Sequence, residues 1–149
     1  MLYIRLRESK TMKISYYLDE KSKVFLEVYE GDLNLNKLID CWNSFWKHPK
    51  FNPDYHLLMD ARAINMGLKF DETLKLSHLI NESKIGFRSK IAVLVSDPKI
   101  AVQADLYGEV TKKVQSLKVF TYEDEALEYV GSTQKLLDRK FECIYSEEG

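Results

Sequence analysis

Asp60 and Arg62 are the two residues whose types and spacing most directly suggest a binding site. They follow a short apolar run, Tyr55 to Asp60, which predicts a buried strand. Ligands of open parallel sheets bind outside the carboxyl ends of the strands. Arg62 can place its guanidinium on a carboxylate or phosphate, and Asp60 can orient it or accept a hydrogen bond from a ligand. The alternative is a structural ion pair that ties down the following loop, predicted over Ala61 to Gly67.

A second polar group follows the buried strand predicted over Lys90 to Val95. Ser96 and Asp97 come at the carboxyl end of this strand, so they lie at the same sheet edge as Asp60 and Arg62. Pro98 begins the next helix, and the N-terminus of a helix favours anions. Ordinary helix capping explains both residues equally well. Tyr107, on the inward stripe of that helix, either lines a pocket or belongs to the core. The candidate ligand-binding residues are therefore Asp60, Arg62, Ser96, Asp97 and Tyr107.

The sequence contains no recognisable catalytic constellation. His48, His56 and His78 lack the spacing of metal ligands, and Cys41 and Cys143 form neither a zinc pattern nor a disulfide framework. There is no P-loop, no Gly-x-Gly-x-x-Gly and no Gly-x-Ser-x-Gly motif. We therefore expect no enzymatic activity, no metal and no cofactor.

Composition indicates a single soluble globular domain. The chain has 149 residues and 17.5 kDa, of which 45% are hydrophobic and 30% charged. Its 22 Lys and Arg residues balance 23 Asp and Glu residues, so a nucleic-acid partner is not expected. The longest apolar run, Ile91 to Val95, is far shorter than the roughly 20 residues of a membrane span, and Met1 to Lys10 contains charges that a signal peptide would lack. A cytoplasmic protein without a membrane span is expected.

Apolar periodicity predicts strands and helices in the order β-β-α-β-α-β-α-β-α. The predicted strands are a hairpin of Met12 to Leu18 and Lys23 to Glu30, then Tyr55 to Asp60, Lys90 to Val95 and Leu117 to Phe120. The first predicted helix is capped by Asn34 and ends before Pro49, and the second begins near a cap at Asp71 and ends at Gly86. The third runs from Pro98 to about Gln115, and the fourth begins at a capping-box-like Thr121 and ends at Gly131. Strands that alternate with helices predict an α/β fold with a mostly parallel sheet and one antiparallel hairpin strand, in one domain of residues 1–149.

Residues 132–149 form a C-terminal extension with apolar side chains to bury. A helix would place Leu137, Phe141, Ile144 and Tyr145 on one face, whereas a strand would align Phe141, Cys143 and Tyr145. Right-handed crossovers between sequential strands would put the main helices on one sheet face and leave Phe25, Tyr29 and Leu58 on the other. We predict that the extension covers that face, or reaches a second subunit in a homodimer.

A set of landmarks is spread over residues 12 to 131. They are Gly31 and Asn34 at the first helix, His48-Pro49 before the third strand, Met59-Asp60-Ala61-Arg62 at its end, the strand Ile91 to Val95, and Val119-Phe120 leading to Glu125-Ala126. With these landmarks the chain resembles the SpoIIAA-like group of the STAS and Sec14-like superfamily. The resemblance implies a sheet wound as a β-α superhelix.

One departure from that group concerns the turn before the second helix. Anti-anti-sigma factors, which belong to the family that the chain resembles, carry a phosphorylatable serine in an Asp-Ser-Ser-Gly-like turn at this place. Here the region reads Gly67-Leu68-Lys69-Phe70-Asp71-Glu72-Thr73, and a phosphate on Thr73 would meet the like charges of Asp71 and Glu72. The serine switch is therefore not transferred to this chain.

Two functions remain from the residues and the resemblance. The first is a non-enzymatic regulatory or scaffolding module that binds an unknown protein partner. The second is a carrier of a small apolar ligand or lipid, because the resemblance to Sec14-like proteins implies a ligand held between helices and sheet. The polar and aromatic groups of such a pocket would be Trp42, Trp46, Tyr107, Asp60 and Arg62.

Overall fold

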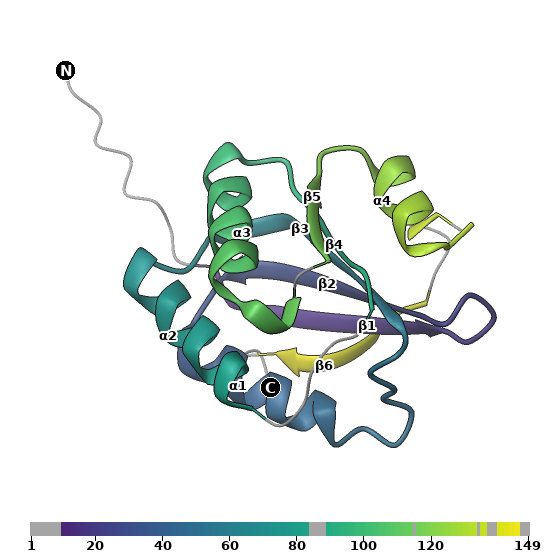
Figure 1. Ribbon diagram of the computed structural model, residues 1–149, viewed down its shortest axis with the longest axis horizontal. Coiled ribbons are helices and arrows are strands. Elements are labelled where there is room, and N and C mark those ends of the chain that lie inside the picture. The colour runs from purple at the N-terminus through teal and green to yellow at the C-terminus, as the bar shows by residue number, and fades with distance from the viewer. Residues whose placement is uncertain (1–9, 84–88, 115, 134, 137–139, 147–149) are drawn as a thin grey trace.

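A six-stranded sheet with helices on both faces makes up the described part of the chain (Figure 1). The computed structural model describes residues 10–83, 89–114, 116–133, 135–136 and 140–146. The elements are β1 (Lys13–Asp19), β2 (Val24–Asp32), α1 (Leu35–Trp46), β3 (His56–Met66), α2 (Phe70–Glu82), β4 (Ile91–Leu94), α3 (Pro98–Val110), the short 3-10 helix η1 (Lys112–Val114), β5 (Leu117–Phe120), α4 (Glu123–Val130) and β6 (Glu142–Ser146). The predicted element order and the α/β class are confirmed.

The strands lie in the order β5-β4-β3-β2-β1-β6. Strands β2 to β5 pair in parallel, and β1 pairs antiparallel with β2, as the hairpin prediction required. The predicted loop over Ala61 to Gly67 is wrong, because β3 continues to Met66. Its second half pairs Ala63 and Ile64 with Glu30 and Gly31 at the end of β2. The backbone hydrogen bonds of this pairing do not depend on side-chain pattern, so apolar periodicity did not reveal it.

Helices α1, α2 and α3 cover one face of the sheet, and α4 covers the other. Phe25 packs against Phe45 of α1, whereas Leu58 packs against α4. The prediction that Phe25, Tyr29 and Leu58 share a face is therefore wrong. Phe25 pairs with Leu57, and Leu58 pairs with Leu26. Because side chains alternate along strands, Phe25 and Leu58 must point to opposite faces. Helix α4 follows the last parallel strand, so no crossover to another parallel strand restricts its position.

The C-terminal extension forms a strand rather than a helix over its described residues. β6 pairs antiparallel with β1, with Lys13 opposite Ser146 (Figure 1). Before this strand, the buried Leu136 and the half-buried Phe141 pack on the sheet face that α4 covers. Leu137 lies outside the described residues. The homodimer stays a prediction.

The N-terminal caps of the helices agree with the sequence predictions for α1 and α3 but not for α2. Asn34 and Asp97 cap α1 and α3 as predicted, with side-chain acceptors for the backbone N–H groups of Lys37 and Lys99. Helix α2 begins at Phe70 rather than after a cap at Asp71, because Glu72 accepts a hydrogen bond from the Lys69 N–H at 2.9 Å.

Further helix boundaries differ from the predictions. Helix α3 ends at Val110 because the Asn81 side chain of α2 takes up the backbone groups at that point. Asn81 Nδ2 donates to the Val110 carbonyl at 3.1 Å, and Asn81 Oδ1 accepts from the Lys112 N–H at 2.9 Å. The predicted cap at Thr121 is wrong, since the residue before α4 is Tyr122, without a side-chain cap. Gly86 and Gln115 themselves lie outside the described residues, but the predicted helix ends there are wrong, because α2 ends at Glu82 and α3 at Val110.

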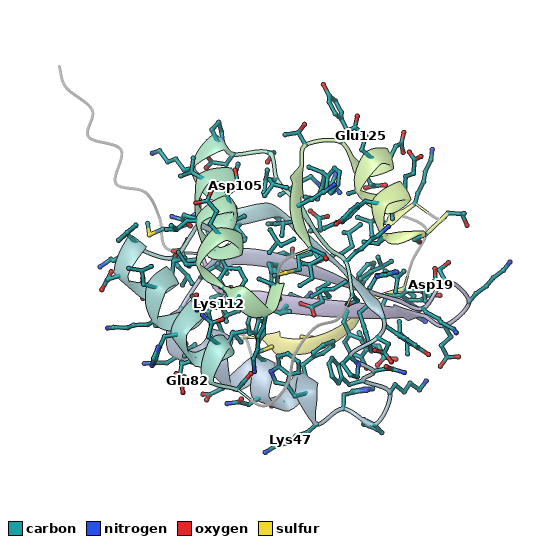
Figure 2. All side chains as sticks on the ribbon, viewed as in Figure 1. Asp19, Lys47, Glu82, Asp105, Lys112 and Glu125 are labelled. Carbon is teal, nitrogen blue, oxygen red and sulfur yellow. The ribbon has the colours of Figure 1, made fainter. Side chains whose placement is uncertain are left out.

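Side chains fill the space between the sheet and both helix layers, while the labelled Lys47, Glu82 and Glu125 point outward (Figure 2). All three of these residues are exposed. Helix α3 approaches β5 closely at Gly108, where a Cβ atom would lie 3.1 Å from Leu117. No helix in the described ranges is long and apolar enough to cross a membrane.

Gly131 provides a test of the backbone contribution to this fold. It ends α4 with a φ of 80°, and a Cβ atom at this position would meet nothing within 4 Å. We therefore expect Gly131→Ala to lower the free energy of unfolding by about 1 kcal/mol through left-handed backbone strain alone. Gly131→Asn should cost less, because asparagine tolerates that conformation. Urea unfolding of the two variants measures the difference, and equal losses would contradict it.

Candidate functional site

The predicted pair Asp60 and Arg62 forms a bidentate ion pair at β3. Arg62 donates from Nε to Asp60 Oδ1 and from Nη2 to Asp60 Oδ2, both at 2.9 Å. Nη2 also donates to Glu123 Oε1, the first residue of α4, at 3.0 Å. Hydrogen bonding to Asp60 raises the pKa of Arg62 above its usual value. The guanidinium therefore already binds two carboxylates and connects β3 to α4, as the structural alternative requires.

Ser96 and Asp97 lie at the same carboxyl edge of the sheet. Ser96 Oγ donates to the Arg62 carbonyl at 3.4 Å, and Asp97 Oδ1 accepts from the Lys99 N–H at 2.9 Å. The structure thus brings Ser96 to Arg62, while Asp97 caps α3. Tyr107 does not join them, because it packs on the face covered by α1, α2 and α3. A ligand-binding role for this edge stays a prediction.

An apolar space lies elsewhere, between the sheet and helices α1 to α3. It is a pocket of about 100 Å³ with almost entirely apolar walls. Its lining residues are Tyr29, Leu33, Leu38, Trp42, Met59, Ala61, Ile64, Leu68, Thr73, Leu76, Val93, Ile100, Gln103, Ala104, Tyr107 and Leu117. A smaller space of about 20 Å³ shares Trp42, Met59, Tyr107 and Leu117 with it and reaches Glu27. The two spaces form one candidate site, which we call the α1–α3 pocket.

The α1–α3 pocket does not match the one predicted for a lipid carrier. Trp42 and Tyr107 line its main space and Trp46 its smaller part. Asp60 faces the opposite side of the sheet, since it alternates with Met59 and Ala61, which line the pocket. The volume of about 100 Å³ is also below the roughly 300 Å³ at which sites for drug-sized ligands begin. Lipid carriage is therefore not supported.

Glu27 is the functional group that the sequence analysis missed. It is 4% exposed, in the middle of β2, between Phe25 and Tyr29 on the same face. Tyr29 donates its hydroxyl hydrogen to the Glu27 carboxylate, and Trp42 Nε1 donates to the Tyr29 oxygen at 3.3 Å. A carboxyl group flanked at i−2 and i+2 by aromatic residues of a buried strand face was the available signal.

Burial changes the acid–base properties of this group. Desolvation raises the pKa of Glu27 to about 7, against the opposing effect of the Tyr29 hydrogen bond. Burial, and then the nearby Glu27 charge, raises the pKa of the neighbouring Cys41 thiol to about 12, so this cysteine is a poor nucleophile. Burial likewise raises the pKa values of Tyr29 and Tyr107. The α1–α3 pocket therefore contains one group that can exchange a proton near neutral pH.

The histidines have structural partners or lie on the surface. His48 Nε2 lies 3.0 Å from the Tyr16 hydroxyl, and His56 Nδ1 accepts from the Lys90 N–H at 2.9 Å. Desolvation, followed by the charge of Lys90, lowers the pKa of His56. His78 is exposed on α2. Within the described residues, no group of three or more His, Cys, Asp or Glu side chains could hold a metal ion.

Thr73 also differs from a surface phosphorylation site. It is 3% exposed, and its Oγ1 donates to the Lys69 carbonyl at 3.0 Å. Modification of this hydroxyl would require the first turn of α2 to open. Burial thus adds a second physical reason, besides the neighbouring carboxylates, not to transfer the serine switch.

Comparisons with known proteins identify the fold. No family model matches the sequence, and no curated protein matches it significantly. A solved structure of an uncharacterised DUF3478-family protein with a SpoIIAA-like fold, from Shewanella loihica PV-4, aligns with a TM-score of 0.52 and 17% identity, over 84% of this chain and 99% of that one. An anti-sigma factor antagonist from Mycobacterium paratuberculosis also aligns with a TM-score of 0.52 and 17% identity, over 78% and 93% of the two chains. The chain has a SpoIIAA-like fold, and the predicted fold is confirmed.

The raised pKa of Glu27 predicts that stability falls as pH rises. The folded-state pKa of about 7 exceeds the unfolded value of 4.5, so the folded protein binds the extra proton between these values. Unfolding free energy should therefore decrease from pH 4.5 to about 7, by up to about 3 kcal/mol. Glu27→Gln should remove this dependence and stabilise the protein at pH 8 but not at pH 4. Urea unfolding measures both effects, with Glu30→Gln on the same strand as control. Identical pH profiles for Glu27→Gln and the parent would contradict the prediction.

The Arg62 ion pairs predict a stability loss that an ordinary surface pair lacks. Arg62→Gln should lower the free energy of unfolding by about 1 kcal/mol, because Arg62 is partly exposed and solvent screens the pairs. The matched control is Lys50→Gln, which removes the exposed Lys50–Glu20 pair at 3.6 Å and should have almost no effect. Thermal melting compares the two variants. An unchanged melting temperature for Arg62→Gln would instead favour the ligand-binding alternative.

Proposed function

We propose that this chain, which has a SpoIIAA-like fold, is a non-enzymatic regulatory module of the cytoplasm that binds a protein partner through the groove between α1 and α2. The observation that carries the proposal is the gathering of exposed apolar side chains on α2. The STAS-like resemblance and the aligned anti-sigma factor antagonist support the regulatory class.

The groove between α1 and α2 is a surface feature of about 490 Å³. Its lining residues are Leu35, Asn36, Ile39, Leu74, Lys75, His78 and Leu79. Leu74 is 39% exposed and Leu79 is 47% exposed. Phe70, one turn before Leu74 on the same helix, is 65% exposed. Leu74 and Leu79 are thus in contact with water where they line the groove, and Phe70 lies on the same side of α2 as Leu74.

The distribution of these residues matters more than their number. The described part of the chain has six exposed large apolar residues, of which three, Phe70, Leu74 and Leu79, lie on α2. The others are Met66 at the end of β3, Val102 on α3 and Tyr122 before α4. Singly scattered apolar residues need no explanation, whereas a contiguous patch usually marks an interaction site.

The chemistry of the groove fits an amphipathic helix or a similar apolar segment of another protein. Leucine and isoleucine side chains form its walls, while Lys75 and His78 supply a polar rim. Grooves of this type accept apolar anchors spaced along one helix face. One of the aligned structures is named as an anti-sigma factor antagonist, a protein that acts on another protein. That name supports a protein partner for this chain as well.

Partner capture by matched variants tests the proposed function. A protein bound through the groove should be retained from a host lysate by the parent chain and by Val102→Asp, which changes an exposed valine of α3. Leu79→Asp should reduce its recovery at least tenfold, because a carboxylate would lose solvation in an apolar interface. Quantitative mass spectrometry measures recovery, and thermal melting checks that both variants fold. Equal recovery with both aspartate variants would reject the groove as the binding surface.

A further inference from the structure

We propose that the α1–α3 pocket is a binding site for a small, single-ring aromatic molecule that carries one hydrogen-bond donor. This inference does not depend on a protein partner at the groove. It rests on the size of the pocket, on its apolar walls and on the hydroxyl group of Tyr29.

The size and the walls of the pocket indicate that the ligand is a single aromatic ring. Its volume of about 100 Å³ suits one aromatic ring, since a cavity of roughly 150 Å³ lined by apolar side chains binds benzene. Trp42 and Tyr107 meet edge to face in its wall, with centroids 6.3 Å apart, and Met59 adds a polarisable sulfur. Tyr29, Thr73 and Gln103 are the few residues with uncharged polar groups in mostly apolar walls, so the pocket favours an apolar ring over water, which needs two to four polar partners.

Tyr29 determines which polar group the ligand carries. A tyrosine hydroxyl has one hydrogen to donate and can also accept hydrogen bonds. Tyr29 already donates to Glu27 and accepts from Trp42 Nε1, so a further bond to its oxygen must be accepted. A ligand can therefore satisfy this oxygen only by donating an N–H or O–H group.

Glu27 limits the charge of the ligand. Its carboxyl group is bonded to the same Tyr29 hydroxyl and lines the smaller part of the pocket. Among the described residues, no Lys or Arg forms an ion pair with it. A ligand carboxylate would therefore place a second negative charge near Glu27 in a poorly solvated space. The site should select neutral donors over acids.

Titration with three ring compounds tests the proposal on the full chain. Phenol has the donor, toluene lacks it and benzoate carries the negative charge. We expect saturable chemical-shift changes with phenol and toluene at backbone amides of pocket-lining residues, and none with benzoate. Absence of saturable binding of both phenol and toluene would overturn the site. Equal binding of benzoate would overturn the proposed selectivity.

Two variants separate the pocket from its polar group. Ala104→Met fills the pocket from α3 and should abolish binding of phenol and toluene, whereas Val102→Met, exposed on the same helix, should leave both unchanged. Tyr29→Phe removes the acceptor and should reduce the preference for phenol over toluene roughly fivefold to tenfold. Retained toluene binding shows that Tyr29→Phe is folded. If Tyr29→Phe does not fold, Ala104→Met alone tests the pocket. Undiminished binding of phenol and toluene to Ala104→Met would overturn the proposal. None of these outcomes depends on partner capture at the groove.

Discussion

The parallel pairing of β2 with β3 determines which side chains each helix layer receives. Phe25 lies opposite Leu57 and Leu26 opposite Leu58, so the two strands present matched apolar rows to both faces. A shift of one residue in this register would reverse every row. The same register places Glu27 beside Met59, on the side of α1, α2 and α3. The position of a charged group in the interior thus follows from the main-chain pairing.

Helices α1 and α2 separate two features with different chemistry. Their inner sides, with Leu38, Trp42, Thr73 and Leu76, line the α1–α3 pocket. Their outer sides, with Leu35, Ile39, Leu74 and Leu79, line the groove. A helix normally buries one stripe and exposes a polar one. Here both sides carry apolar residues, which indicates that more than the core has shaped the sequence of these helices.

We expect the α1–α3 pocket to lower the stability of the fold. By the dependence measured for truncated core residues, an enclosed and unfilled space of about 100 Å³ would cost about 2 kcal/mol. The ionised form of Glu27 adds a desolvation cost of similar size above neutral pH. Sites that reduce stability without a structural benefit are where function is expected. Arg62 contrasts with them, because its partners Asp60 and Glu123 give it an evident structural role.

Local patterns were sufficient for the element order, for the caps at Asn34 and Asp97, and for the αL glycine at Gly131, because each depends on residues only a few positions apart. The sequence alone also indicated the polar edge of Asp60, Arg62 and Ser96, since parallel strands place their carboxyl ends together.

The tertiary structure alone decided the remaining features. Arg62 reaches Glu123, which is 61 residues away, and Asn81 ends a helix 29 residues further along the chain. The face covered by α4 likewise depends on contacts between distant elements. The aromatic residues on either side of Glu27 in the sequence indicate which strand face it shares, but its burial depends on the helices that cover that face. Trp42, Trp46 and Tyr107 were expected in a pocket and do line it, whereas Glu27 was missed because the acidity of a carboxyl group depends on what surrounds it in space.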